Sequence, residues 1–188
     1  FEEIPIVIRS FMAAGLTQVA EINEENRTIN LRFASDTDLS SVIPYFYLDD
    51  GASTEEQPYE KIDLSSGKAT IGAGQYQWTI TATKNSVMKE FYVDGKWGND
   101  SNSGTSSNNA FATLKAAKDA ICTINNWTGD VVVHIAKGEY VLSETLEFTT
   151  EDSAPKGYAV IWDGDDANDV QITSGVPLNG TWKKSTDV

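Results

Sequence analysis

The sequence predicts a mainly β protein, with an immunoglobulin-like β-sandwich over residues 1–91 and the helix-capped first coils of a right-handed parallel β-helix over residues 92–188. Three observations support this prediction. Short alternating apolar runs separated by turns fill the first segment. A single amphipathic helix is indicated in the second segment. After this helix, short apolar runs recur between Gly and Asp corners, without the further helices that a βαβ sheet requires.

The first segment contains seven or so strand-like runs. Residues 17–22 and 27–33 flank the polar turn "NEEN" and predict a hairpin. Further strands are expected at residues 5–11 and 42–50, and two short ones within 60–71, on either side of Ser66-Gly67. Residues 74–85 and 86–93 are expected to form a final hairpin. Residues 49–60 are expected to form a loop. The expected core residues are Trp78, Phe33, Phe46 and Ile80.

The second segment opens with a strand at residues 90–96 and a polar loop at 97–109. A helix is predicted within residues 112–126, with Thr113 as its N-cap and Asn125-Asn126 at its end. Its apolar face consists of Leu114, Ala117, Ile121 and Ile124. We expect this helix to cover the open end of the coil core, where strand edges and apolar side chains would otherwise be exposed.

Four apolar runs follow the helix, at residues 130–136, 144–150, 158–164 and 169–175. Their spacing predicts a full turn of about 25 residues that carries two strands, which is typical of a parallel β-helix. Because a stacked fold needs about three repeats to bury its core, we expect this chain to continue in a longer protein or to pair with a second fragment or chain that supplies later coils.

Composition restricts the partners. The chain has 188 residues and a formal net charge of −14, which disfavours nucleic acid and anionic membrane surfaces. No apolar run approaches the roughly 20 residues that span a bilayer. Residues 1–11 lack the features of a signal peptide and are expected to form a strand of a mature domain. The Asn, Ser, Thr and Gly content is typical of secreted or cell-surface bacterial proteins.

The single cysteine, Cys122, and the single histidine, His134, exclude a zinc site of the usual kind. Cys122 is interpreted as a small buried side chain in the helix rather than a catalytic thiol. Alternation places Val131, Val133 and Ile135 on one face of a strand, and Val132 and His134 on the other. His134 is therefore expected to be a satisfied or edge-exposed strand residue rather than a catalytic base.

The first segment resembles a known family of modules. Its "SDTDLSSVIPYFYLDDGAS" and "YQWTITATKNSVMKEFYV" are similar to the small Ig-like modules at the N-terminus of surface glycan-processing proteins of gut bacteria. Ser35 and Asp36 depart from the Gly of that pattern, and Lys84-Asn85-Ser86 are expected at its hairpin turn. In that family the modules are spacers or lids, so the resemblance implies no catalytic residue here.

The second segment resembles the opening of right-handed β-helix carbohydrate-active enzymes, such as glycoside hydrolase family 141 and related hydrolases and polysaccharide lyases. Ala110 replaces the proline of that pattern. The matching positions are Tyr92, Val93, Gly98, Asp100, Gly104, Thr105, Phe111, Thr113, Leu114, Ala117, Gly138, Tyr140, Leu142, Glu144, Thr145, Leu146, Ile172, Gly175 and Trp182.

This resemblance implies the non-catalytic N-terminal portion of a secreted glycan-degrading enzyme. Hydrolases of this kind use paired carboxylates, and lyases use a base, often with Ca²⁺ neutralising an acidic sugar. In the resembling families these groups lie on later coils, so no catalytic, cofactor-binding or metal-binding residue is assigned to this chain, and carbohydrate is its expected ligand. The alternatives are a polysaccharide lyase of the same fold and a non-catalytic glycan-binding or adhesin stalk.

Two acidic turns could hold Ca²⁺, although local turn hydrogen bonds explain them better. One contains Asp163, Asp165, Asp166 and Asp169, and the other Asp94, Asn99 and Asp100. Trp97, Trp127 and Trp182 could stack on sugars but are expected in the core. Glycosylation sequons at Asn26, Asn99, Asn126 and Asn179 are interpreted as incidental.

Overall fold

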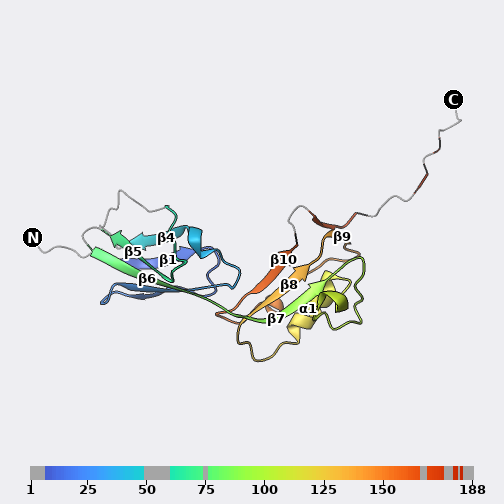
Figure 1. Cartoon of the computed structure of the whole chain (residues 1–188), viewed down its shortest axis with the longest axis horizontal. Helices are drawn as coiled ribbons and strands as arrows, with labels where there is room; N and C mark the ends of the chain where they lie inside the picture. The colour runs from blue at the N-terminus through green and yellow to red at the C-terminus, as the bar shows by residue number, and fades with distance from the viewer. Residues whose placement is uncertain are drawn as a thin grey trace, which may run out of the picture. The chain divides into compact units, whose positions relative to one another are not determined.

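The computed structural model describes residues 7–48, 60–73, 76–165, 169–175, 180–181 and 183. The expected loop at 49–59 and the residues Asp166, Asn179 and Trp182 lie outside this part of the chain. The described part is mainly β, with several sheets and one α-helix (Figure 1). The chain forms two compact units: unit 1 comprises Phe1–Glu90, Thr123–Val132 and Asp152–Ile161, and unit 2 comprises Phe91–Cys122, Val133–Glu151 and Trp162–Val188. The predicted domains 1–91 and 92–188 stay a prediction.

Unit 1 contains two sheets around a common core. β1 (Ile8–Ala13) pairs antiparallel with β4 (Pro44–Leu48). The second sheet has the order β2-β3-β6-β5 and comprises β2 (Glu21–Asn23), β3 (Thr28–Phe33), β6 (Tyr76–Lys84) and β5 (Lys68–Ala73). The predicted β2–β3 hairpin is confirmed, and β3 runs parallel to β6. A short 3-10 helix, η1 (Leu39–Ser41), precedes β4.

Alternation along the strands builds the core of unit 1. In β3, Ile29, Leu31 and Phe33 are buried, whereas the residues between them face outward. Phe11 and Phe46 stack from the other sheet, with ring centroids 6.1 Å apart. The expected core residues Trp78, Phe33, Phe46 and Ile80 are all buried in this single apolar cluster. The immunoglobulin-like character of this unit stays a prediction.

The final hairpin expected for the first segment is wrong. β7 (Val87–Val93) does not pair with β6; it belongs to a three-stranded sheet of order β10-β8-β7, in which the other strands are β8 (Asp130–Ile135) and β10 (Val160–Gly164). Figure 1 shows these three strands side by side. The Asp130 backbone N–H donates to the Ser86 carbonyl just before β7. This carbonyl is therefore bonded to the start of β8 and is not used in a β6–β7 hairpin.

The three strands run parallel. The Asp130 amide bonds to the Ser86 carbonyl, and the Ala136 amide bonds to the Val93 carbonyl, so residue numbers rise together along β7 and β8. The Val131 amide bonds to the Ala159 carbonyl, and the Asp165 amide bonds to the Ile135 carbonyl, which gives β8 and β10 the same direction.

Two further short strands also pair in parallel, and they follow β8 and β10 in turn along the chain. β9 (Gly138–Val141) pairs with β11 (Val170–Thr173), with Gly138 opposite Val170. The strand expected at 144–150 is wrong, because its Glu144 and Glu147 are exposed and the chain instead forms β9 earlier, directly after a corner at Gly138. The β8–β10 and β9–β11 pairs are each offset by about 30 residues, which is longer than the predicted turn.

The predicted helix is α1 (Leu114–Cys122). Leu114, Ala117 and Ile121 are buried, as predicted, whereas Ile124 lies beyond the helix. The Thr113 hydroxyl oxygen accepts the Ala116 amide at 3.1 Å, which confirms the N-cap. Cys122 is exposed, so its assignment to the core is wrong. Two further 3-10 helices, η2 (Ser107–Asn109) and η3 (Thr150–Asp152), complete the described elements.

A buried carboxylate lies at the start of β8. Asp130 is fully buried, and its oxygens accept hydrogen bonds from the Ser35 amide at 2.7 Å, the Asn85 side chain at 2.8 Å and the Ala159 amide at 2.9 Å. Three donors compensate the cost of removing this charge from water.

In the described part of the chain, no helix has the length and apolar character that crossing a membrane requires.

Candidate functional site

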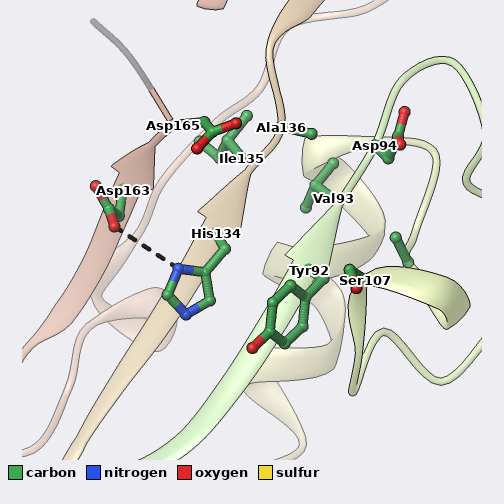
Figure 2. A pocket seen from close by; sticks show the side chains of 10 residues that line it. Tyr92, Val93, Asp94, Ser107, His134, Ile135, Ala136, Asp163 and Asp165 are labelled. Atoms are coloured by element: carbon green, nitrogen blue, oxygen red, sulfur yellow. Dashed lines mark ion pairs between the residues drawn. The ribbon is translucent and has the colours of Figure 1, made fainter.

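Unit 2 contains a pocket of about 280 Å³. The pocket lies where β7, β8 and β10 end, and η2 and the chain around it supply a further wall. Figure 2 shows the lining side chains, which are Tyr92, Val93, Asp94, Ser107, Ala110, His134, Ile135, Ala136, Asp163 and Asp165. The fold therefore gathers four separate parts of the sequence, within residues 92–94, 107–110, 134–136 and 163–165, into one site.

Three side chains form a row across the three strands: Tyr92 on β7, His134 on β8 and Asp163 on β10 (Figure 2). The Tyr92 and His134 rings stack with centroids 4.8 Å apart, which is the spacing of neighbouring strands. His134 Nδ1 lies 3.6 Å from Asp163 Oδ2. At that distance the two groups interact by charge when the imidazole is protonated, rather than by a short hydrogen bond.

The pocket is acidic at its rim. Asp94, Asp163 and Asp165 all contribute to its lining, and no Lys or Arg is among the lining residues. Asp94 Oδ1 already accepts the amides of Lys96 and Trp97 at 2.8 and 3.0 Å, so one of its oxygens is used in a turn. The carboxylates of Asp163 and Asp165 are exposed at the end of β10.

Tyr140 supports the wall of the pocket from the interior. Its hydroxyl donates to the Ala136 carbonyl at 2.7 Å, lies 3.3 Å from the Val93 carbonyl and accepts the Gly95 amide at 3.4 Å. Burial raises the pKa of the Tyr140 phenol, because the charged phenolate would lose its contact with water. A Cβ at Gly95 would lie 3.1 Å from the Tyr140 ring, so any side chain there would require the ring to shift.

The structure brings together some of the acidic residues considered for Ca²⁺. Asp94, Asp163 and Asp165 line the same pocket, whereas Asp100 bonds to the start of α1 and Asn99 closes a local turn with the Ser101 amide. Asp169 uses its backbone carbonyl to bind the Gly138 amide. Within the described ranges, no three His, Cys, Asp or Glu side chains are grouped so that they could hold a metal ion.

The tryptophans follow the core prediction only in part. Trp97 is 78% exposed, so its assignment to the core is wrong; Lys96 Nζ lies 4.9 Å from its ring centroid. Trp127 is half-buried. Trp162, which was not considered from the sequence, meets Phe148 edge to face with centroids 5.6 Å apart.

Sequence reasoning missed Tyr92 as a pocket residue and both Tyr140 and Asp130 as hydrogen-bonding centres. In the sequence, Tyr92 and Tyr140 stood out only as positions that match the β-helix carbohydrate-active enzymes, and that resemblance assigned them no role. Asp130 was the one charged residue at the head of the apolar run "DVVVHIA", and that contrast is the signal that could have identified it.

Comparisons with known proteins identify no family. No family model matches the chain, and no curated protein matches it. One similar solved structure is a "Glycoside hydrolase", with 24% sequence identity and a TM-score of 0.45; the match covers 52% of this chain and 17% of that one. Another, from Bacteroides thetaiotaomicron VPI-5482, is provisionally described as a glycoside hydrolase, with 25% identity and a TM-score of 0.34, covering 49% of this chain and 29% of that one. The match thus spans less than a third of either structure.

Proposed function

We propose that this chain is the non-catalytic N-terminal portion of a secreted bacterial glycoside hydrolase with a right-handed parallel β-helix, preceded by an Ig-like module. The catalytic carboxylates of that enzyme lie on later coils outside these 188 residues. The observation that carries the proposal is the repeated parallel pairing in which β10 lies beside β8 and β11 beside β9.

This pairing supports a solenoid for a topological reason. The chain first passes through β8 and β9 and then through β10 and β11. β10 pairs in parallel with β8, and β11 pairs in parallel with β9. Parallel neighbours without helical crossovers require the chain to return to the same side after each round, as a coil does. Among the described residues between β8 and β11, the single-turn η3 is the only helix.

The motif behind the carbohydrate-active resemblance is a folded unit in this chain. A Cβ at Gly98 would lie 2.1 Å from the Phe111 carbonyl oxygen, and a Cβ at Gly104 would lie 2.1 Å from the Phe111 ring. Asp100 binds the amide and hydroxyl of Thr113 at the start of α1. Gly98, Gly104, Asp100, Phe111 and Thr113 therefore contact or make room for one another within one loop. This supports the interpretation that they form one structural motif.

Further coils would have a surface on which to add. Ile172 on β11 lies opposite the buried Tyr140 of β9 and shares its face of the sheet, yet Ile172 is 55% exposed. Apolar side chains of this size are usually covered in a finished core. We therefore propose that a continuation of the β-helix, in the same polypeptide or in a second fragment, is the protein partner and that carbohydrate is the ligand.

The test compares two samples on a panel of complex polysaccharides: the natural polypeptide that carries these residues, and the 188-residue chain alone. We expect the natural polypeptide to release new reducing ends without unsaturated uronate products, and the chain alone to release none. Release by the chain alone would contradict the assignment of the catalytic groups to later coils.

The same measurement separates the alternatives. Unsaturated uronates, detected by their ultraviolet absorbance, would identify a polysaccharide lyase of the same fold. Binding of glycans by the natural polypeptide, without any cleavage, would identify a glycan-binding or adhesin stalk. Either result would reject the hydrolase assignment.

A further inference from the structure

We propose that the pocket around Tyr92 and His134 binds one sugar residue of a glycan and accepts neutral or amino sugars in preference to uronic acids. The inference deepens the proposed function and rests on it, because that function supplies a glycan as the ligand. It assigns a binding site to coils that carry no catalytic group.

The size of the pocket fits a single ring. Its volume of about 280 Å³ is close to the lower end of pockets that hold small molecules, about 300 Å³. A monosaccharide unit fits such a space, whereas an extended oligosaccharide does not. The remaining units of a glycan would project into solvent beyond the rim.

The lining combines the two surfaces that a pyranose presents. Val93, Ala110 and Ile135 contribute apolar atoms to the lining, and the half-buried Tyr92 ring provides an aromatic face for the C–H groups of the sugar. At the rim, the exposed carboxylates of Asp163 and Asp165 are acceptors for sugar hydroxyls. Pockets that bind small polar molecules generally have this composition, with a mostly apolar surface and a few converging polar groups.

Charge decides between sugar classes. Asp94, Asp163 and Asp165 contribute negative charge, the lining contains no Lys or Arg, and the whole chain carries −14. A uronate carboxylate in the pocket would lie close to like charges, and this lowers its affinity. An ammonium group of an amino sugar would be attracted. The pocket therefore favours neutral and amino sugars over acidic glycans.

The pocket is held in shape before any ligand arrives. The Tyr140 hydroxyl bonds to the Ala136 carbonyl and lies near the Val93 carbonyl, so it fixes two lining residues at the ends of β8 and β7. Tyr92 and His134 restrain each other by stacking. A preformed site loses less conformational entropy on binding, which matters for a ligand as small as one sugar.

The test is titration of the ¹⁵N-labelled chain with methyl glycosides that differ in one group: galactoside, galactosaminide and galacturonide, and the same set in the gluco series. We expect at least one neutral or amino sugar to shift the amides of residues 92–94, 107–110, 134–136 and 163–165. The corresponding uronide should bind more weakly. Absence of shifts in the pocket with every sugar, or equal binding of the uronide, would overturn the inference.

Variants assign the preference to the carboxylates. The double change Asp163→Asn and Asp165→Asn keeps the side-chain shapes and removes two charges, so the affinity of uronide relative to neutral sugar should rise about tenfold. Tyr92→Leu should abolish the shifts. Glu151→Gln and Tyr47→Leu, at exposed positions outside the pocket, are the matched controls and should leave binding unchanged. The amide spectrum of each variant shows whether it is folded, and an unchanged ratio in a folded double variant would contradict the charge argument.

The outcome is distinguishable from failure of the proposed function. Cleavage of glycans by the natural polypeptide, together with an unresponsive pocket, would reject this site and leave the enzyme assignment intact. Sugar binding in the pocket without cleavage by the natural polypeptide would reject the enzyme and support the binding stalk.

Discussion

Asp100 accepts hydrogen bonds from both the backbone amide and the hydroxyl of Thr113, each at 2.9 Å. The same carboxylate accepts the Ala112 amide at 2.8 Å, so it fixes the chain immediately before α1 from the middle of a polar loop. Thr113 in turn caps the helix by accepting the Ala116 amide. The loop and the helix are therefore one cooperative unit.

Replacement of Asp100 tests this unit. Asp100→Ala removes three acceptor contacts at a helix start and should lower the free energy of unfolding by about 1–3 kcal/mol, measured by urea denaturation. Asp119→Ala is the matched control, since it breaks an exposed pair with Lys115 within the helix and should change the stability far less. Equal effects of the two changes would argue against the capping role.

Gly104 is predicted to tolerate no side chain. Its φ is +68°, and a Cβ would lie 2.1 Å from the Phe111 ring, so Gly104→Ala combines backbone strain with a clash. We expect a loss of about 2–4 kcal/mol or failure to fold, measured by thermal and chemical denaturation. Gly72→Ala, where nothing lies within 4 Å of the added carbon, should have little effect or stabilise the protein slightly.

The buried carboxylate of Asp130 should be sensitive to removal. Asp130→Ala leaves the Ser35 amide, the Asn85 side chain and the Ala159 amide without their acceptor, and we expect a loss of about 2–5 kcal/mol. Asp36→Ala, at an exposed position of the same unit, should change stability by less than about 0.5 kcal/mol. A folded Asp130→Ala protein with unchanged urea midpoint would show that the carboxylate contributes nothing to stability.

Tyr140 predicts a dependence of stability on alkaline pH. Because burial raises the pKa of its phenol in the folded state, the unfolded chain loses this proton first as the pH rises. The contribution of Tyr140 to stability is therefore complete below about pH 10 and decreases as the pH rises through its higher folded-state pKa. Urea unfolding at a series of alkaline pH values should show a steeper loss in the natural chain than in Tyr140→Phe.

The same variant tests the support of the pocket. Tyr140→Phe keeps the ring but loses the bond to the Ala136 carbonyl, so it should cost about 0.5–1.5 kcal/mol at neutral pH. The amides of residues 93–95 and 136 should shift in its spectrum. Identical spectra would show that the hydroxyl does not hold the wall.

The sequence alone determined those features that local periodicity and cap chemistry encode. Alternation identified Phe33, Phe46, Trp78 and Ile80 as core, because an apolar residue at every second position of a strand shares one face. The "NEEN" turn predicted the β2–β3 hairpin, and Thr113 predicted the start of α1. Each of these features depends on residues within a few positions of one another.

Tertiary structure alone decided the strand partners and the pocket. β6 and β7 are joined by only two residues, yet β7 pairs with β8. The sequence does not reveal this choice, because strands pair through backbone groups that are the same in almost every residue. The row of Tyr92, His134 and Asp163 exists only in the register of that parallel sheet. Asp130 likewise gained its three donors from distant segments, because long-range contacts leave no periodic signal in the sequence.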